Sequence, residues 1–492
     1  MKILLVYPDY PETFWSFKYA LKFVFKKASN PPLGLLTIAS LLPRDWEVKL
    51  IDMNVEKLKD RHITWADYVF ISAMSVQRAS VHKIIQRCRS LDRKIVAGGP
   101  LFTTDFEEFP GVDHFVLNEG EITLPQFLED LKNGEPKKIY QSTDWAELNE
   151  SPVPRWELLK TRKYASLCIQ YSRGCPFNCE FCDITLLFGR KVRTKTINQL
   201  LNELENIYQI NWKGAVFFVD DNFIGNKKIL KEEVLPEIIA WQKKHNYPFS
   251  FITQCSIDLS DDKELLDKMR LAGFDTVFIG IETVNEDSLA ECNKYQNKNR
   301  DMVECVKKIQ QAGLQVQGGF IVGFDNDPFS IFETQIKFIQ KSGIVTAMVG
   351  LLHVLPRTKL YWRLKKENRI LSSGSGNNTD SSLNFIPKME EHKLLDGYKK
   401  IVKTLYSPKV YYTRVITFLK EYQPFVTKGS KLTFRDMYAF FRSIVLIGIN
   451  GKEWFHYWRL VLWTSLNKPK LFPLAITLAI YGFHFRKVFE KI

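Results

Sequence analysis

Cysteines, long apolar runs and an apolar leader are scarce or absent in this sequence. Eight cysteines in 492 residues are too few for a disulfide scaffold, so we expect free thiols in a reducing compartment. The longest apolar stretch, residues 471–483, is shorter than the roughly 18–20 residues that span a bilayer, and Pro473 interrupts it. Only Ile3 to Val6 form an apolar run near the start, whereas a secretory signal needs about 7–15 such residues. The sequence therefore favours a cytoplasmic protein.

Net charge is small over most of the chain and is concentrated at its end. The formal net charge is +14, and residues 401–492 supply +11 of it, from 15 Lys and Arg against 4 Asp and Glu. A nearly neutral body with a basic end is not typical of a general nucleic-acid coat. Apolar residues make up 45% of the chain, which is enough for packed cores and excludes wholesale disorder.

Residues 1–140 alternate short apolar runs with amphipathic segments. Apolar strands are predicted at residues 3–7, 48–52, 68–72, 95–97 and 114–117. This alternation predicts an α/β domain with a doubly wound, Rossmann-like parallel sheet, whose ligands would lie at the carboxyl ends of the strands. The segments at these ends are rich in small and polar residues, which is typical of a binding crevice but also of simple turns: Pro8–Pro11, Ser72–Gln77, Gly98–Pro100 and Asn118–Glu121.

A second α/β series follows a linker at residues 141–165 that contains two prolines. Within residues 166–370, strands are predicted at 167–172, 215–219, 250–254, 276–281, 316–322 and 345–353. Six strand–helix units without a reversal predict a partial (β/α)6 barrel, a shortened relative of the eight-stranded barrel. Gly and Ser within residues 371–387 predict a flexible loop. Residues 388–492 lack the alternation and predict a mostly helical C-terminal domain.

Three of the eight cysteines lie within eight positions, in the segment Arg173-Gly-Cys175-Pro-Phe-Asn-Cys179-Glu-Phe-Cys182. They follow the first strand of the second series. Three thiolates on such a tight loop can hold three corners of a [4Fe–4S] cluster, for which four cysteines are the usual complement. No fourth cysteine is close in sequence, so one iron would stay open for a cofactor or substrate, as a catalytic zinc keeps an open position. The alternatives are chance spacing and a zinc site, but no His lies near to complete a zinc site.

This CxxxCxxC spacing resembles the signature of the radical SAM superfamily. The resemblance implies that Cys175, Cys179 and Cys182 bind the cluster and that its open iron chelates S-adenosylmethionine (SAM). Later segments resemble the strand-end motifs of the same family: DDNFIGNKK at 220–228, GIET at 280–283, QGGFIVGF at 317–324 and LLHVLP at 351–356. The SAM contacts implied by this resemblance are Phe181, Asp220, Asp221, Glu282, Gly318, Gly319 and Pro356. Two adjacent aspartates are also typical of a helix N-terminus.

Residues 1–130 resemble the cobalamin-binding domain of the B12-dependent class, and the whole chain resembles a bacterial subgroup that contains the hopanoid C-2 methylase. The implied cobalamin contacts are Pro8, Ser72, Met74, Gln77, Gly98, Gly99, Pro100, Asn118 and Glu119. The motif Asp-x-His-x-x-Gly is absent, because Trp65 replaces the Gly after Asp60 and His62. Cobalamin would then bind without a protein imidazole below cobalt. Arg357 is a second departure, since Gly often follows the proline of the last strand motif.

The resemblance implies three cofactors, a [4Fe–4S] cluster, SAM and cobalamin, and a reaction that cleaves SAM reductively to C-methylate an unactivated carbon. It also implies an electron donor such as flavodoxin or ferredoxin. A cobalamin-dependent radical SAM cyclase or rearrangement enzyme without methyl transfer stays open, as does an iron–sulfur or cobalamin sensor. A methylthiotransferase is disfavoured, because that group carries a second cluster on three N-terminal cysteines and residues 1–160 contain only Cys88. No catalytic side chain is assigned.

Basic residues of the region 388–492 are interleaved with aromatics, in segments such as YAFFRSIVLIGI and WFHYWRLVLW. This pattern is typical of a helix on an anionic membrane surface, of stacking on bases, or of an aromatic core with a solvated basic face. We expect no nucleic-acid partner. We expect peripheral contact with the inner face of the membrane through this domain, which would also cover the open end of the barrel. The expected substrate is a large apolar, hopanoid-like molecule.

Overall fold

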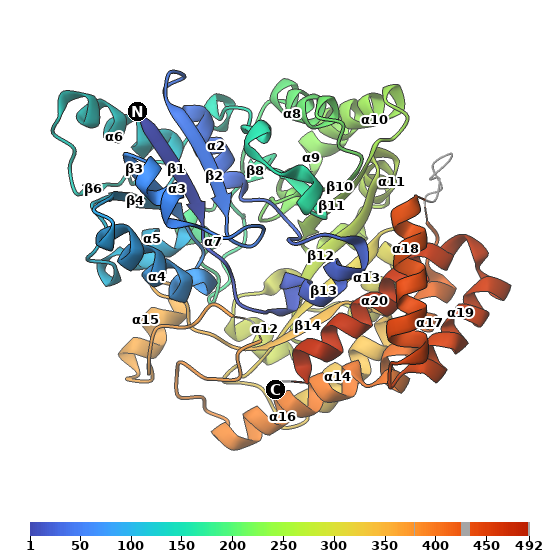
Figure 1. Cartoon of the computed structure of the whole chain (residues 1–492). Helices are drawn as coiled ribbons and strands as arrows, with labels where there is room; N and C mark the ends of the chain where they lie inside the picture. The colour runs from blue at the N-terminus through green and yellow to red at the C-terminus, as the bar shows by residue number, and fades with distance from the viewer. Residues whose placement is uncertain (378, 425–432, 491–492) are drawn as a thin grey trace.

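The computed structural model describes residues 1–377, 379–424 and 433–490. It contains an N-terminal α/β unit, a second α/β unit and a helical C-terminal unit (Figure 1). All strands of the two six-stranded sheets are parallel, so the predicted fold class is confirmed.

The N-terminal sheet has the strand order β2-β1-β3-β4-β5-β6. Its strands are β1 (Lys2–Tyr7), β2 (Glu47–Asp52), β3 (Tyr68–Ser72), β4 (Lys94–Gly98), β5 (His114–Val116) and β6 (Ile139–Tyr140). Its helices are α1 (Lys18–Leu21), α2 (Leu33–Leu41), α3 (Asp60–Trp65), α4 (Arg78–Ser90), α5 (Pro100–Asp105) and α6 (Gly120–Asn133). Leu4 and Val6 of β1 are buried with α3, α4 and α5, whereas Ile3 and Leu5 are buried with α2 and α6. Helices thus cover both faces, as a doubly wound sheet requires.

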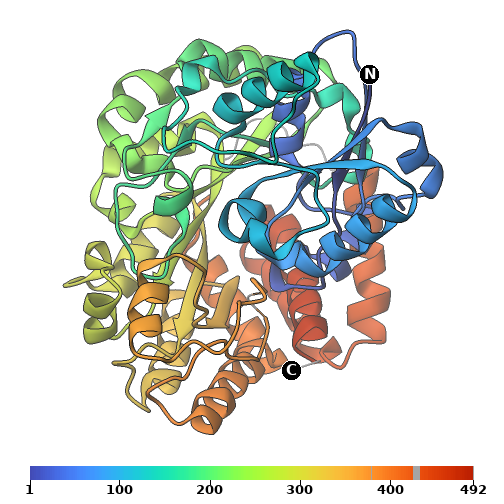
Figure 2. The ribbon, with the colours of Figure 1, turned by 90° about the vertical axis from the view of Figure 1, so that its left-hand side faces the viewer.

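The second sheet has the strand order β14-β13-β12-β11-β10-β7 and forms the partial barrel. Its strands are β7 (Ser166–Ile169), β10 (Gly214–Phe218), β11 (Phe249–Cys255), β12 (Phe274–Glu282), β13 (Gln315–Val322) and β14 (Ala347–Leu351). Helices flank it on the outside (Figure 2): α8 (Ile197–Gln209), α9 (Lys227–Ile229), α10 (Leu235–Lys244), α11 (Lys263–Ala272), α12 (Glu286–Glu291), α13 (Met302–Gln311) and α14 (Ile331–Ser342). On β12, Val277 and Ile279 are fully buried toward these helices, so Phe278 and Gly280 face the barrel interior.

The C-terminal unit is helical, as predicted. Its helices are α16 (Glu391–Tyr406), α17 (Pro408–Glu421), α18 (Phe434–Ser443), α19 (Trp454–Asn467) and α20 (Phe472–Phe489), and a π-helical segment, η12 (Ile444–Ile449), continues α18. Helix α15 (Lys359–Lys366) comes earlier, after the last barrel strand. Helices α16 and α17 pack on α14 of the barrel, and α20 contacts α16, α17, α18 and α19. None of the described helices is both long and apolar enough to cross a membrane.

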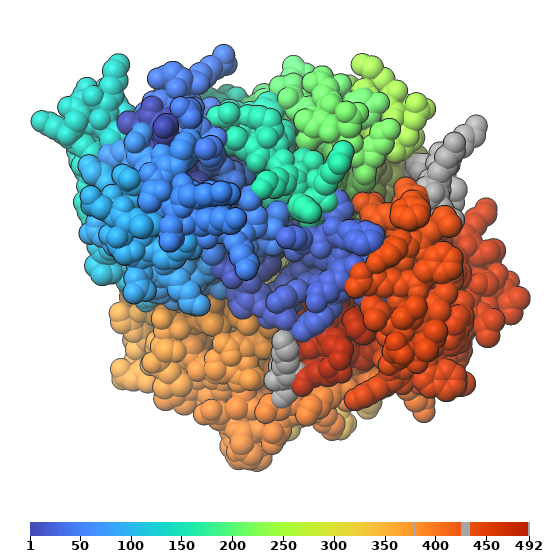
Figure 3. Space-filling model, viewed as in Figure 1, coloured from blue at the N-terminus to red at the C-terminus, as the bar shows by residue number. Residues whose placement is uncertain are grey.

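One segment of the N-terminal unit lies between the barrel and the C-terminal helices. Residues 14–24 contact both α18 and α20, and in Figure 3 dark blue residues adjoin the red helices. The Phe14 ring stacks on Phe485 of α20 with centroids 4.1 Å apart, and its carbonyl oxygen is hydrogen-bonded to His484 Nε2 at 3.0 Å. This crossing joins all three units in one apolar core, which was not predicted from the sequence.

The loop at residues 371–387 lies against the carboxyl end of the N-terminal sheet. Asn384 bonds the backbone of Val354 through both its amide nitrogen, at 2.8 Å, and its oxygen, at 3.0 Å. A Cβ on Gly376 would lie 2.9 Å from the Cβ of Ser75, which follows β3. Residue 378 of this loop lies outside the described residues. The described part of the loop therefore bridges the barrel and the N-terminal unit.

Candidate functional site

The three clustered cysteines lie between β8 (Ser172–Arg173) and α7 (Ile184–Leu187), on residues 174–183, which we call the cysteine loop. All three are free thiols, and Cys179 is 9% exposed. The loop turns at Gly174, whose φ is +93°, and a Cβ there would lie 2.6–3.1 Å from three carbonyl oxygens. A residue with a side chain would clash at this position, so glycine is required before the first cysteine.

The thiols of the cysteine loop fit a cluster better than a single ion. Among the described residues, no three Cys, His, Asp or Glu side chains come close enough together to hold one metal ion. A zinc site needs every sulfur within about 2.3 Å of one point. A [4Fe–4S] cluster takes each cysteine on a different iron, so its sulfurs stand further apart. Cys179 is buried and the other two cysteines are half-buried, and this burial raises the pKa of all three thiols.

Two carboxylates, the buried Asp220 and the half-buried Asp221, hold the backbone that leads into the cysteine loop. Asp220 follows β10 and accepts hydrogen bonds from the amides of Tyr171 (3.2 Å) and Ser172 and from the Ser172 hydroxyl (2.5 Å). Asp221 accepts one from the Gly174 amide at 3.0 Å. Burial raises the pKa of Asp220 to about 6 and that of Asp221 to about 7. Both aspartates lie at the loop, but the protein itself occupies both oxygens of Asp220.

Glu282 ends β12 in a left-handed conformation, with φ at 61°. Its Oε1 accepts a hydrogen bond from Lys294 Nζ at 2.7 Å, and a Cβ on Gly280 would collide with both atoms. Burial lowers the pKa of Lys294, but the negative charges of Glu282 and Cys179 outweigh it and raise this pKa. A cation therefore lies beside the cysteine loop. Sequence reasoning missed it, because Lys294 stands in a loop after α12 and outside every motif.

Glu180, between the second and third cysteine, ties the loop to α15. Its carboxylate accepts hydrogen bonds from Arg363 Nε (2.7 Å) and Nη2 (3.1 Å), and its carbonyl oxygen accepts one from the Leu360 amide (2.9 Å). The next residue, Phe181, lies 6.2 Å from the Phe324 ring in an apolar cluster. An apolar wall thus stands beside the cysteines.

The two glycines predicted on β13 face opposite ways. A Cβ on Gly319 would touch Phe278 inside the barrel, whereas a Cβ on Gly318 would touch side chains of the outer layer. Only Gly319 can therefore approach a ligand from the interior. Pro356 lies beyond β14, and the neighbouring Arg357 has φ at 63°, a conformation that explains why glycine suits that position.

Residues predicted at the carboxyl ends of the N-terminal strands come together, because β1, β3, β4 and β5 are neighbours in the sheet. The buried Gln77 donates a hydrogen bond to the carbonyl oxygen of Pro8 at 2.5 Å and accepts one from the Met74 amide at 2.8 Å. Gly99 has φ at +89°, and a Cβ there would lie 2.5 Å from Ser72 Oγ. The other predicted residues at this edge are Gly98, which ends β4, Pro100, which begins α5, and Asn118, which follows β5.

Glu119 faces the barrel across the boundary between the α/β units. Its carboxylate, 1% exposed, accepts hydrogen bonds from Arg193 Nη1 (2.8 Å) and Nη2 (3.0 Å) and from Arg173 Nη1 (2.9 Å). Glu121 accepts one from Arg173 Nη2 at 2.7 Å. Burial raises the pKa of Glu121, but Arg173 brings it down to about 2. The pairing was not predicted, since the arginines lie more than 50 residues away in sequence.

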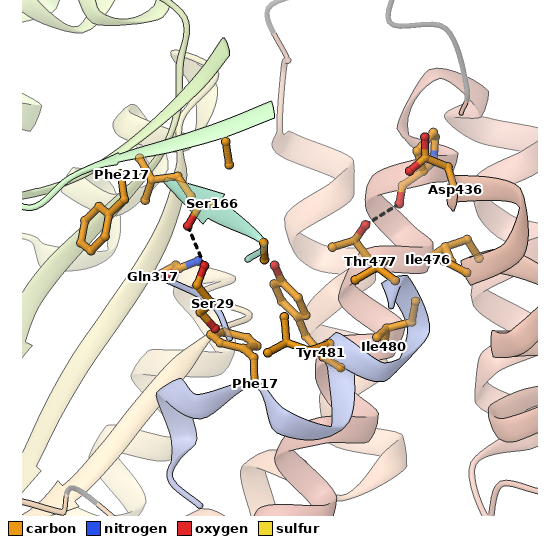
Figure 4. A pocket seen from close by; sticks show the side chains of 18 of the residues that line it. Phe17, Ser29, Ser166, Phe217, Gln317, Asp436, Ile476, Thr477, Ile480 and Tyr481 are labelled. Atoms are coloured by element: carbon orange, nitrogen blue, oxygen red, sulfur yellow. Dashed lines mark hydrogen bonds between the residues drawn. The ribbon is translucent and has the colours of Figure 1, made fainter. Parts of the chain in front are cut away.

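A cavity of about 610 Å³ lies against the inner side of β10, β11, β12 and β13. Its other walls are the segment 15–30 and helices α18 and α20 (Figure 4). Most of the lining is aromatic or aliphatic, for example Trp15, Phe17, Phe217, Phe278, Ile476 and Ile480. Since all three units contribute walls, the cavity was beyond sequence-based prediction.

Comparison with known proteins identifies the family of the barrel and that of the N-terminal α/β unit. Residues 169–353 match the radical SAM superfamily, residues 27–128 match the B12 binding domain, and residues 358–492 match a domain of unknown function. An uncharacterized methyltransferase of Synechocystis sp. is 40% identical over 497 residues, covering 100% of this chain and 92% of that protein. The hopanoid C-2 methylase of Rhodopseudomonas palustris is 31% identical over 475 residues, covering 94% of this chain and 89% of that protein.

Two solved structures share the fold. The cobalamin-dependent radical enzyme OxsB, with aqua-cobalamin bound, has a TM-score of 0.62 at 16% identity, covering 100% of this chain and 80% of that chain. The methyltransferase TsrM from Kitasatospora setae, with cobalamin and a [4Fe–4S] cluster bound, has a TM-score of 0.59 at 15% identity, covering 76% of this chain and 79% of that chain.

The fold and the cysteine loop define a radical SAM enzyme that carries a B12-binding domain. The chain belongs to the family of cobalamin-dependent radical SAM methyltransferases. Its cofactors are a [4Fe–4S] cluster, SAM and cobalamin.

Proposed function

We propose that this enzyme C-methylates an unactivated carbon of a large apolar substrate that occupies the cavity inside the barrel. The cofactors supply a radical that removes hydrogen from carbon and a methyl group that replaces it. The cavity carries the proposal, because its lining is largely apolar and its volume is that of a site for a sizeable molecule. We assign cobalamin binding to residues 1–140, a linker to 141–165, the radical SAM barrel to 166–370, a loop to 371–387 and the cover of the barrel to 388–492.

Residues of the barrel's carboxyl end would hold the cluster and SAM. Cys175, Cys179 and Cys182 leave one iron of a cluster without a cysteine, and that iron is the place for SAM. Glu282 and Lys294 present a carboxylate and an ammonium group side by side, which matches the opposite charges that the methionine part of SAM carries. Phe181, Gly319 and Pro356 would line the adenosine, Gly318 would act by packing, and Asp220 and Asp221 would position the loop.

The strand-end loops of the N-terminal sheet would hold cobalamin against the barrel. Pro8, Met74 and Gln77 are already hydrogen-bonded to one another at this edge. His62 lies in α3 and its Nδ1 accepts a hydrogen bond from the amide of Lys59. We therefore propose that no imidazole from the Asp60 to Trp65 segment coordinates cobalt. Ser72, Gly98, Gly99, Pro100, Asn118 and Glu119 complete the proposed contacts.

Exposed apolar side chains at the mouth of the cavity support contact with a membrane surface. Along α18 and η12 they recur every three or four residues, which places them on one side of the helix. They are Phe434, Met437, Phe441, Val445 and Ile449, between 49% and 82% exposed. Met437 also lines the cavity. We propose that this stripe rests on an anionic leaflet, to which each nearby Lys or Arg adds roughly 1 kcal/mol, and that the enzyme works at the cytoplasmic face.

The cluster assignment is tested with anaerobically reconstituted protein. Replacing Cys175, Cys179 and Cys182 by Ala together should abolish the brown chromophore and reductive SAM cleavage, because no protein sulfur would remain for the irons. The matched control is Cys88→Ala, since Cys88 is buried in α4 of the other α/β unit. A full cluster in the triple variant would contradict the assignment.

Membrane contact is tested by sedimentation with phosphatidylglycerol vesicles at low and high salt. Point substitutions are better than truncation, because α20 packs on Phe14 and its removal would open the core. Phe434→Glu with Phe441→Glu should lower vesicle binding at least tenfold, whereas Phe329→Glu, 59% exposed before α14, should leave it unchanged. Wild-type protein that stays in the supernatant at low salt would remove the membrane proposal.

The reaction is tested by comparing lipid extracts of a host with and without the gene. Methyl transfer predicts a product heavier by one methylene group than its precursor. A cyclase or rearrangement reaction would leave the carbon count unchanged. A reductant such as flavodoxin or ferredoxin must be supplied when the purified enzyme is assayed.

A further inference from the structure

We infer that Gln254 and Gln317 form a neutral hydrogen-bonding row inside the barrel that binds an uncharged oxygen group, such as a hydroxyl or carbonyl, on the leading end of an otherwise apolar substrate. This inference rests on the proposed apolar substrate and names the chemical group by which the enzyme would recognise it. Both glutamines line the cavity on strands that are otherwise rich in apolar residues.

The two glutamines lie at one height in the barrel. In the strand register, Gln254 of β11 pairs with Phe278 of β12, and Phe278 pairs with Gln317 of β13. Because strand side chains alternate between faces, all three point to the inner side that the cavity occupies. They form a row in which an aromatic ring lies between two amides.

Neither amide has a hydrogen-bond partner among the described residues. Buried glutamines elsewhere in the same unit differ: Gln242 Nε2 donates to the Phe249 carbonyl at 2.9 Å and Gln335 Nε2 to the Ile321 carbonyl at 3.0 Å, whereas Nε2 of Gln310 and of Gln315 has no partner among the described residues. An amide that faces an apolar cavity without a partner is costly unless a ligand or water supplies one. The two amides are half-buried, so the row offers free donors and acceptors to a polar group inside an apolar site.

The position of the row says which part of the substrate it meets. One step nearer the cofactor end, Gly280 pairs with Gly319, and the space over these glycines is taken by the Phe278 ring and by the Glu282–Lys294 pair. Two residues along a strand span about 7 Å. The group held by the amides would thus lie at the end of the substrate that is closest to the cluster, while Ile476 and Ile480 contact its apolar remainder.

The charges of the lining decide between a neutral and an anionic group. Among the described lining residues there is no Lys, Arg or His, and the single carboxylate is Asp436 on α18. Tyr481, whose pKa burial raises to about 12, adds a neutral hydroxyl. An acid would meet no countercharge there, whereas a hydroxyl or carbonyl group can use the amides as donors or acceptors.

The test measures binding of three radiolabelled polycyclic triterpenoids with one ring skeleton, an alcohol, its parent hydrocarbon and its carboxylic acid, in mild detergent. Wild-type protein should bind the alcohol about tenfold more tightly than the hydrocarbon, as two neutral hydrogen bonds allow. Gln254→Met with Gln317→Met, which nearly keeps side-chain volume, should reduce this ratio to about one, and each single variant should reduce it about threefold. Gln209→Leu, at the exposed end of α8, is the control.

Each outcome separates the inference from the function it rests on. Wild-type protein that binds the alcohol and hydrocarbon equally, or prefers the acid, overturns the amide row but leaves the apolar cavity standing. A double variant that keeps the cluster chromophore and the wild-type ratio overturns it as well. If no probe binds wild-type protein, the apolar substrate itself is refuted. Should the double variant fail to fold, the ratio of alcohol to hydrocarbon affinity is measured in Tyr481→Phe and in the two single variants, and a wild-type ratio in all three overturns the inference.

Discussion

Breaking one partner of the buried ion pairs between the two α/β units should destabilise the cofactor-free protein strongly. Replacing Glu119 by Gln removes the negative charge that faces Arg193, whose side chain is 6% exposed. Breaking one partner of a buried pair costs about 3–5 kcal/mol. We expect the lower end, about 3 kcal/mol, because Arg193 keeps the carbonyl oxygens of Ala146 (2.6 Å) and Phe188 (3.0 Å). For units of this size the loss corresponds to a fall of roughly 6–12 °C in Tm.

A double-mutant cycle in differential scanning calorimetry measures the coupling directly. Glu119→Met combined with Arg193→Met should recover most of the loss, because two apolar side chains leave no buried charge unpaired. The exposed pair Arg155–Glu157, with side chains 33% and 61% exposed, is the control and should contribute less than about 1 kcal/mol. A Glu119→Gln protein within about 0.5 kcal/mol of wild type would refute the argument that this pair locks the units together.

Three further results are expected. Lys294→Met should make the reduction potential of the cluster more negative and weaken SAM binding at least tenfold, because a cation beside the cysteines is lost. A redox titration followed by electron paramagnetic resonance measures the potential, and an unchanged potential would contradict this role of Lys294. Arg363→Met should speed the loss of iron to a chelator, since Glu180 would no longer anchor the loop, and equal rates would contradict this. Arg173 depresses the pKa of Glu121 from 4.5 to about 2, so the ionised Glu121 should stabilise the folded protein fully above pH 4.5 and lose this effect as the pH falls toward 2. In acid denaturation, Glu121→Gln should therefore make the free energy of unfolding less dependent on pH over this range.

Local patterns predicted the fold and the cysteine loop well. Short apolar runs located every strand of both sheets except β6, because burial on two faces leaves continuous apolar runs. The cysteine spacing stood out because a cluster needs its ligands on one short loop. Gln254 and Gln317 also left a signal, since glutamine at an inward position of an apolar strand is unusual.

Long-range pairings were not predictable in the same way. Arg193 finds Glu119 across 74 positions, and Lys294 reaches Glu282 from a loop without periodicity. The orientation of Gly318 away from the interior depends on the strand register, which a motif does not specify. These contacts form only when the elements of the fold pack against one another, so local sequence patterns do not reveal them.

The contact between Phe14 and His484 has a consequence for synthesis of the protein. The two residues are 470 positions apart, and a ribosome adds about 5–20 residues per second. The first apolar segment therefore waits roughly 25–90 seconds before the helix that covers it exists. During this interval Phe14, Trp15 and Phe17 lack their final partners, so the nascent chain exposes apolar side chains that chaperones would have to shield. When helix α20 packs against Phe14, it completes both the apolar core and one wall of the cavity inside the barrel.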